Sequence, residues 1–157
     1  MKKLIDKSTE VVLIILMITL LFTVLWQVIS RYLLNDPSAY TDELAGYLLI
    51  WMGLLGSAYV TGQKGHLAID YFVLKMTAPN QTRVQIVVRV LIFLFSLIAL
   101  VIGGLWLVFS RFNLEVTSAA LSIPLGYIYL IIPVIGILIC YYAISEILAI
   151  TIKQKKL

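Results

Sequence analysis

Four long apolar runs, separated by short polar stretches, dominate the pattern of the 157-residue chain. About 20 apolar residues in a helix are needed to cross roughly 30 Å of hydrocarbon. The runs are continuously apolar, whereas strands of a membrane barrel alternate over about 10 residues. The pattern therefore predicts an all-α integral membrane protein, with a single membrane domain over residues 1–157. Its four transmembrane helices are expected at residues 11–33, 42–63, 84–110 and 124–147.

The segment between the second and third runs, GHLAIDYFVLKMTAPN, is too short to span a membrane and too apolar for an ordinary loop. If it is helical, its apolar residues fall at positions i, i+3, i+4 and i+7, which form one stripe. The spacing predicts a short amphipathic helix over residues 66–77, lying in the membrane interface. The residues that form this stripe are Ile69, Phe72, Val73 and Met76.

Composition and charge agree with a membrane protein and give it an orientation. Hydrophobic residues make up 62% of the chain and charged residues 13%, against about 45–50% and 25% in soluble domains. All Lys and Arg residues except Arg31 and Arg111 lie at the termini or around the connection between the second and third runs. Because basic residues resist translocation, both termini are expected in the cytoplasm. The net charge of +4 therefore reflects topology, and no nucleic-acid partner is expected.

Helix-breaking and capping residues mark the first external connection. Residues 35–37, Asn-Asp-Pro, predict a stop after the first helix. Thr41 is then expected to cap the second helix, with Asp42 and Glu43 in its first turn, where acids stabilise the helix dipole. A second interpretation makes both acids part of an external contact surface. Pro133 is expected to kink the fourth helix.

Small residues along the second run predict close helix packing. Gly53 and Ser57 have the small-xxx-small spacing that lets two helix backbones approach in lipid. Gly46 and Gly56 lie in the same run. This face is expected to meet another helix, either in this chain or in a partner. Similar packing is expected at Gly103, Gly104 and Gly136.

The chain carries little of the chemistry that enzymes need. It has one histidine and one cysteine, which cannot supply bis-histidine haem ligation or a dithiol cycle. No metal-ligand spacing and no nucleophile elbow occurs in the sequence. Arg89 and Glu146 fall near the ends of apolar runs, where long side chains can snorkel to the surface. We therefore expect no enzymatic activity, and no catalytic, metal, cofactor or substrate site on this chain.

Residues 40–71, YTDELAGYLLIWMGLLGSAYVTGQKGHLAIDY, resemble the small membrane subunit of tripartite ATP-independent periplasmic (TRAP) transporters, the DctQ-like family. Tyr40 stands where that family often has Trp. The matching residues are the acids Asp42 and Glu43, the aromatic Trp51, the glycine Gly56, and the turn residues Gly65, His66, Ile69 and Asp70. Length, span number and termini fit over the whole chain.

The resemblance implies a small, non-catalytic subunit of a Na⁺-coupled importer of organic acids, such as sialic acid or C4-dicarboxylates, in the bacterial inner membrane. Its partners would be a large membrane subunit, which carries substrate and Na⁺, and transiently a periplasmic substrate-binding protein. The chain itself would contact the lipid bilayer and could hold a bound phospholipid. The resemblance assigns helix packing to Gly46, Trp51, Gly53, Gly56 and Ser57, the periplasmic surface to Asp42 and Glu43, and the cytoplasmic turn to Gly65, His66, Ile69 and Asp70.

Two questions stay open at this point. His66 and Asp70 form either a local i,i+4 pair that fixes the start of the interfacial helix or a pH-sensing pair. The chain as a whole could instead be a self-sufficient four-helix exporter or channel acting as a homo-oligomer. A small membrane enzyme subunit or a cytochrome anchor is a third alternative.

Overall fold

The computed structural model describes residues 2–63 and 78–155, and they are almost entirely helical. Four helical stretches are long and apolar enough to cross a membrane, at Lys2–Tyr32, Ala39–Gly62, Asn80–Asn113 and Leu125–Ile152. The prediction of an all-α protein with four such helices is confirmed. The elements are α1 (Lys2–Tyr32), α2 (Ala39–Gly62), α4 (Ala78–Phe95), the π-helix η1 (Ser96–Ile102), α5 (Gly103–Asn113), α6 (Leu125–Tyr129) and α7 (Ile131–Lys155).

Several helix ends differ from the sequence-based expectation. α1 begins at Lys2, well before residue 11, and α2 begins at Ala39 with Ser38 as its N-cap. The expectation that Thr41 caps α2 is wrong, because Thr41 already lies inside the helix and its hydroxyl donates to the Ser38 carbonyl at 3.0 Å. The interfacial helix expected over residues 66–77 falls outside the described residues.

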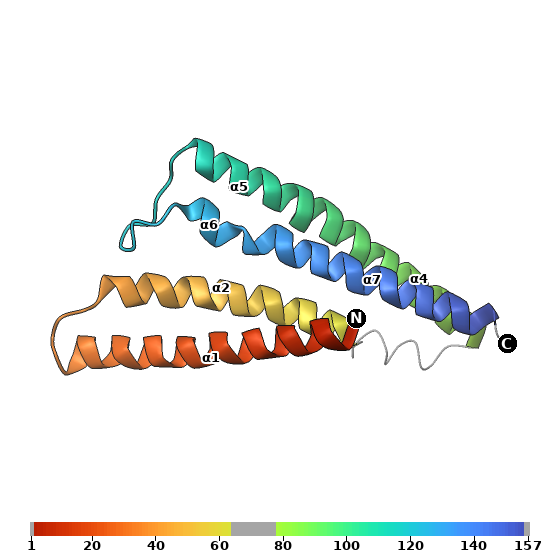
Figure 1. Ribbon diagram of the computed structural model, residues 1–157, viewed down its shortest axis with the longest axis horizontal. Coiled ribbons are helices and arrows are strands. Elements are labelled where there is room, and N and C mark those ends of the chain that lie inside the picture. The colour runs from red at the N-terminus through yellow and green to blue at the C-terminus, as the bar shows by residue number, and fades with distance from the viewer. Residues whose placement is uncertain (1, 64–77, 156–157) are drawn as a thin grey trace.

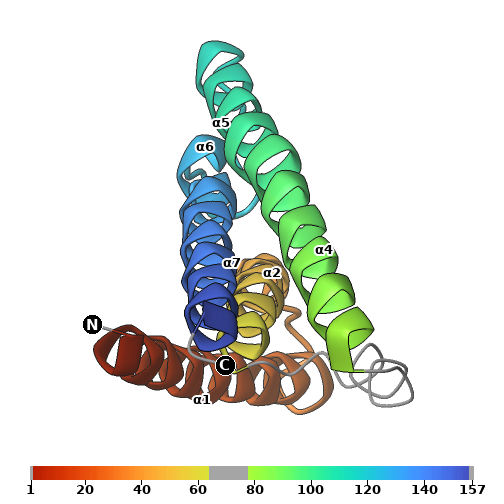
Figure 2. The ribbon, with the colours of Figure 1, turned by 90° about the vertical axis from the view of Figure 1, so that its right-hand side faces the viewer.

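The helices form two antiparallel hairpins joined through α2 and α7. α1 packs along α2, α2 packs on α7, and α7 packs on the continuous rod of α4, η1 and α5. Figure 1 shows the two chain termini at one end of the molecule, and Figure 2 shows α1 and α5 on opposite sides of α2 and α7. We call the end with the termini the termini end. The opposite end, with the connections at residues 33–38 and 114–124, is the loop end.

The seam between α1 and α2 follows a seven-residue repeat, as expected for antiparallel helices that supercoil gently around each other. On α1 the buried positions are Thr9, Leu16, Thr23 and Ser30. The hydroxyls of Thr9 and Thr23 donate to carbonyls one turn earlier in their own helix, at 2.9 and 2.8 Å. These small polar residues are therefore satisfied in an apolar seam, and they allow close approach of α2.

The third span contains one residue more than its contact with α7 requires. Its buried positions Arg89 and Ser96 are seven residues apart, whereas Ser96 and Gly104 are eight apart. The π-helix η1 absorbs the extra residue: the Gly103 N–H donates to the Ile98 carbonyl, five residues back. This widened turn keeps all three buried residues on the same face.

The fourth span is interrupted where proline requires it. α6 ends at Tyr129 and α7 begins at Ile131. Proline at position 133 has no N–H to donate to the carbonyl of Tyr129, and its ring crowds that carbonyl. The predicted kink near Pro133 is therefore present, one turn before the proline itself.

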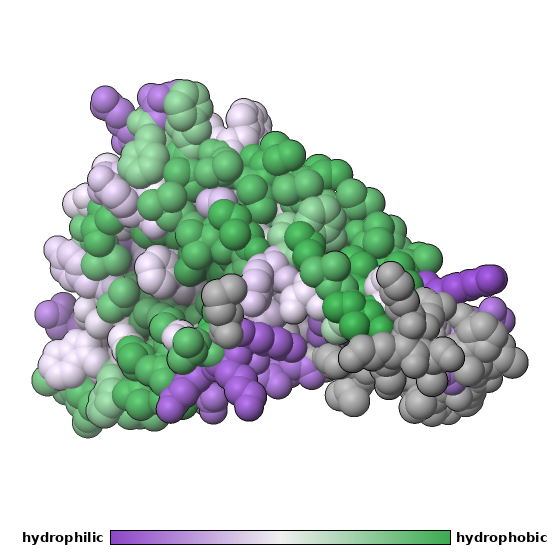
Figure 3. Space-filling view, turned by 45° about the vertical axis from the view of Figure 1, so that its right-hand side comes forward, coloured by the Kyte–Doolittle hydropathy of each residue, from purple (hydrophilic) through white to green (hydrophobic). Residues whose placement is uncertain are grey.

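Burial is uneven across the four spans. In the most apolar window of the first span 11% of residues are buried, against 44% in the fourth, so α7 is the central helix and α1 lies at the edge. Apolar side chains cover most of the face in Figure 3, with polar ones toward its margins. The core cluster consists of Leu16, Leu48, Leu55, Ala58, Ile135 and Ile139.

Candidate functional site

Glu43 holds the loop between α5 and α6. Its carboxylate accepts hydrogen bonds from the backbone N–H groups of Ala119, Ala120 and Leu121 at 3.1, 2.7 and 3.1 Å. The Tyr47 hydroxyl, one turn along α2, donates at 2.6 Å. Consecutive N–H groups that point to one anion form a nest. Glu43 therefore fixes the loop from inside the chain and does not project from the surface as a free acid.

The loop backbone adopts unusual geometry to make this nest. Glu115 and Ser122 have φ values of 49° and 54°, in the left-handed region that side chains rarely adopt. An isolated antiparallel bridge joins Thr117 to Pro124 and closes the loop at its base. The carboxylate and the bridge together hold the loop against the start of α2.

Asp42, although adjacent to Glu43, contacts a different helix. Its carboxylate accepts a hydrogen bond from the Gln27 side-chain amide and pairs with Arg31 at 3.4 Å, both on α1. The side chains of Arg31 and Asp42 are 48% and 43% exposed. The sequence left two interpretations of these acids, as stabilisers of the helix dipole or as an external contact surface. The structure adds a third role, in which Asp42 joins α2 to α1 and Glu43 joins α2 to the loop between α5 and α6.

Trp51 fastens the middle of α2 to the fourth span. Its indole N–H donates to the Ile128 carbonyl at 2.9 Å, close to the break between α6 and α7. Because the break leaves carbonyls without helical N–H partners, the indole satisfies one of them. Trp51, assigned to helix packing from the sequence, thus packs within this chain.

The glycines divide into two groups. A Cβ on Gly62 would lie 2.7 Å from the Tyr142 ring, and one on Gly104 would lie 2.9 Å from Ile132. A Cβ on Gly46, Gly53 or Gly56 would meet nothing within 4 Å. Within residues 2–63 and 78–155 the face predicted from the small residues of α2 is therefore open, and its contact with a partner stays a prediction. Ser57 on the same helix is exposed, and its hydroxyl donates to the Leu54 carbonyl at 2.7 Å.

A buried ion pair joins α4 to α7 near the termini end, and the sequence interpretation missed it. Arg89 Nε lies 2.7 Å from Glu146 Oε2, with side chains only 9% and 4% exposed. Both residues were expected to snorkel outward, but they face each other inside the bundle. The signal available in the sequence was that two opposite charges stand at similar distances from the same membrane face, one in each of two neighbouring spans.

A second polar contact at the termini end joins α7 to α1. The Tyr142 hydroxyl donates to Asp6 Oδ1 at 2.7 Å, and the Tyr142 side chain is fully buried. The Lys2 ammonium lies 6.0 Å from the centre of the same ring. One helix, α7, therefore receives polar side chains from both hairpins at this end.

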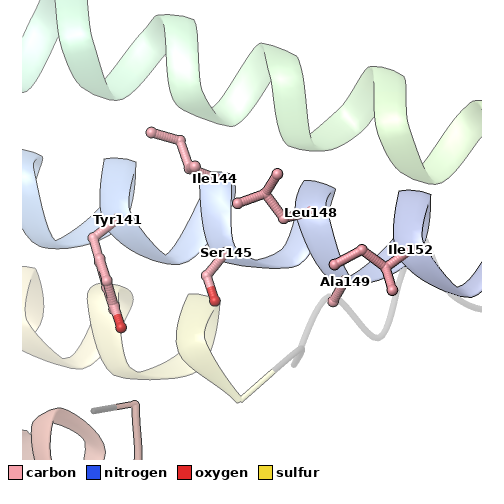
Figure 4. A pocket seen from close by; sticks show the side chains of 6 residues that line it. All are labelled: Tyr141, Ile144, Ser145, Leu148, Ala149 and Ile152. Atoms are coloured by element: carbon pink, nitrogen blue, oxygen red, sulfur yellow. The ribbon is translucent and has the colours of Figure 1, made fainter.

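A groove of about 390 Å³ runs along the last turns of α7. Figure 4 shows the lining side chains, which come from one helix and are aliphatic apart from the phenol ring of Tyr141 and the hydroxyl of Ser145. Such a surface suits hydrocarbon better than a polar ligand. The lining residues are Tyr141, Ile144, Ser145, Leu148, Ala149 and Ile152.

The residues predicted to form the cytoplasmic turn are not among those that the structure describes. Gly65, His66, Ile69 and Asp70 lie outside the described residues, so their roles stay predictions. In residues 2–63 and 78–155, no group of three or more His, Cys, Asp or Glu side chains could hold a metal ion. The polar groups that the structure does bring together join helices of this chain to one another.

Comparison with known families identifies the kind of membrane protein in which these polar contacts between the described helices occur. The family model described as the DctQ component of tripartite ATP-independent periplasmic transporters matches residues 12–151. The chain belongs to the DctQ family. It is thus a small permease subunit of a TRAP transporter and a multi-pass membrane protein, and the resemblance seen in residues 40–71 is confirmed.

Individual relatives of this DctQ chain carry matching names. The sialic acid TRAP transporter small permease protein SiaQ of Vibrio cholerae is 30% identical over 139 residues, which cover 83% of this chain and 79% of SiaQ. A putative TRAP transporter small permease protein of Haemophilus influenzae is 24% identical over 145 residues, covering 92% and 88%. The sialic acid TRAP transporter permease protein SiaT of Haemophilus influenzae is 33% identical over 73 residues, covering 44% of this chain and 12% of SiaT.

Proposed function

We propose that this DctQ chain is a non-catalytic subunit that enlarges and holds the membrane scaffold of a Na⁺-coupled importer of organic acids. The large membrane subunit would carry the substrate and Na⁺. The observation that carries the proposal is the open small-residue face of α2, where a Cβ added to Gly46, Gly53 or Gly56 would meet nothing within 4 Å among the described residues. In lipid, small residues are useful where another backbone comes close.

The match to SiaT supports a large permease as the partner. A segment similar to this chain forms 12% of that much longer protein, so a sequence of this type can be part of one polypeptide with a larger permease. An association within one chain in a relative is consistent with an association between two chains here. Carboxylates such as sialic acid or C4-dicarboxylates are the proposed substrates, and sialic acid appears in the names of two relatives.

The orientation proposed for this subunit places both termini in the cytoplasm and the loop end in the periplasm, across the bacterial inner membrane. The distribution of basic residues supports it. The loop held by Glu43 would then face the periplasm, where a substrate-binding protein would dock transiently. The apolar groove of α7 would lie near the cytoplasmic face and would suit the acyl chain of a bound phospholipid.

The experiment that tests the proposed function combines association with transport. The chain would be co-expressed with the large permease and purified, and uptake of sialic acid or succinate would be measured in liposomes with and without a Na⁺ gradient and the binding protein. We expect uptake only when both membrane subunits are present. Transport by this chain alone would favour the alternative of a self-sufficient exporter or channel.

A matched pair of variants tests the proposed interface. Gly53→Phe fills the open face of α2, and Val12→Phe places the same aromatic ring on the exposed side of α1. Gly53→Phe is expected to reduce co-purification with the large subunit while leaving the isolated chain stable. Equal co-purification of both variants with the large subunit would show that the α2 face is not the contact.

A further inference from the structure

Arg89 and Glu146 stand where both could have reached water. Arg89 is followed by an uncharged stretch up to Ser110, so it lies close to one end of the third span. Long charged side chains at such positions usually turn toward the membrane surface. Here both side chains turn inward, are at least nine-tenths buried, and meet at 2.7 Å. Burying both charges costs hydration free energy that two solvated side chains would have kept, so the buried arrangement requires a physical explanation.

Apolar contacts alone leave the register of α4 and α7 poorly specified. The neighbouring contact residues are aliphatic, including Ile92 on α4 and Ile139 on α7. Around Ile92, before the Ser96 hydroxyl that donates to the Gly136 carbonyl at 2.8 Å, a slide of one helical turn, about 5.4 Å, exchanges one aliphatic contact for another. The same slide would separate Arg89 from Glu146 and leave the buried Arg89 guanidinium without this counter-charge, which is strongly unfavourable.

Because of the π-helix, the ion pair can specify the register of α4 against α7 only toward the termini end. η1 lies between Arg89 and Gly104, and it takes up the extra residue that separates them. On its far side, Gly104 fits against Ile132 and Pro133. The register is therefore set by packing toward the loop end, whereas the ion pair is the charged contact between α4 and α7 toward the termini.

We propose that Arg89 and Glu146 are a positioning pair that sets the register of α4 against α7 and excludes slipped arrangements of the second hairpin. The role resembles that of a single buried polar residue that fixes the register of a coiled coil at a cost in stability. Arg89 Nη1 is buried without a hydrogen-bond partner in the described part of the chain. This incomplete satisfaction indicates that the pair serves specificity more than stability.

The single native cysteine provides a probe of the register. Cys140 Sγ lies 3.9 Å from the Phe93 carbonyl, so Phe93→Cys reports the native register by disulfide cross-linking to Cys140. Leu97→Cys lies one turn farther along the span and reports a slipped register. Leu94→Cys is the control because its side chain is 44% exposed. Cross-linking would be measured in membranes that contain the full chain and the large subunit.

The expected pattern differs between three backgrounds. Glu146→Leu alone should lower cross-linking at position 93 roughly tenfold, since the remaining buried charge opposes the native contact. Arg89→Leu with Glu146→Leu should keep the chain folded but spread cross-linking over positions 93 and 97. The charge exchange, Arg89→Glu with Glu146→Arg, should confine cross-linking to position 93 again.

The double-leucine background separates a register role from a purely stabilising one. If its cross-linking stays confined to position 93, packing alone sets the register and the proposal is overturned. Unchanged cross-linking in Glu146→Leu would overturn it as well. If the double-leucine chain does not accumulate, the charge exchange decides: native cross-linking supports the proposal, and cross-linking no better than in Glu146→Leu contradicts it.

Discussion

Two arginine–carboxylate pairs in the described part of the chain have the same chemistry in opposite surroundings. At the loop end, Arg31 and Asp42 lie 3.4 Å apart with side chains 48% and 43% exposed. Near the termini end, Arg89 and Glu146 lie 2.7 Å apart with side chains 9% and 4% exposed. Both pairs join neighbouring antiparallel helices. They differ in how much solvent each charge has lost.

Burial determines how much free energy of folding is lost when one partner of an ion pair is removed. An exposed pair exchanges water for a partner at nearly equal free energy, so its loss changes little. A buried pair has already lost the hydration of both groups, so removing one partner leaves the other with neither water nor a counter-charge. The two hairpins of this DctQ chain should therefore respond very differently to the loss of one acid.

The largest expected effect is that of Glu146→Leu. The free energy of unfolding of the chain in bicelles should fall by about 3–5 kcal/mol, because Arg89 stays buried without its partner. The matched control is Arg89→Leu combined with Glu146→Leu, which should recover most of the loss. A single variant as stable as the native chain would contradict the contrast between the two pairs.

The next effect separates packing from charge at the same end. Gly62→Ala places a Cβ 2.7 Å from the buried Tyr142 ring and should lower the free energy of unfolding by about 1–3 kcal/mol through overpacking. Gly53→Ala is the control, since nothing lies within 4 Å of its added carbon. In the isolated chain that control should be neutral or slightly stabilising. Equal destabilisation by both would show that the Tyr142 contact is not the cause, because the higher helix propensity of Ala acts in the opposite direction at both positions.

A more local effect is expected at the loop end from Glu43→Ala. It removes the acceptor of three backbone N–H groups of the loop while leaving the spans intact. The labelling rate of a Ser122→Cys probe should rise severalfold, with little change in global stability. Glu115→Ala, which removes an exposed acid from the same loop, should leave the rate unchanged. A tight loop in the Glu43 variant would mean that the Thr117–Pro124 bridge suffices.

The smallest effect is expected for the exposed pair. A double-mutant cycle with Arg31→Ala and Asp42→Ala should give a coupling of about 0.2–1 kcal/mol, reduced by salt. The measurement is the free energy of unfolding at low and high ionic strength. A coupling as large as that of the buried pair would show that solvent exposure does not weaken the Arg31–Asp42 pair.

The sequence predicted the number of spans and the family well, because both follow from the order of residues along the chain. Apolar run length determined the spans, and the acids, Trp51 and Gly56 carried the resemblance. The ion pair was missed because distance from the end of a run does not say which way a helix is rotated. Arg89 looked like a residue that reaches the surface, and only the placement of α7 beside α4 shows otherwise.

The small residues also show that a pattern along one helix does not identify the residue that packs against it. The close packing expected at Gly104 and Gly136 is present, whereas the spacing of Gly53 and Ser57 indicated a contact that is made within the described chain at Gly62 instead. A glycine is needed where a particular neighbour lies, such as the ring of Tyr142 beside Gly62. Spacing along one helix carries no information about that neighbour.

The seven-residue π-helix at Ser96–Ile102 also bears on how such a chain can change over generations. A regular helix that gains one residue turns every later side chain by about 100°, which would take Gly104 away from α7. A π-turn accepts that insertion and leaves both flanking faces where they were. Length can therefore vary by one residue in the middle of this span, and a descendant that deletes a residue there would return to a regular helix with Arg89 and Gly104 still facing the same partner.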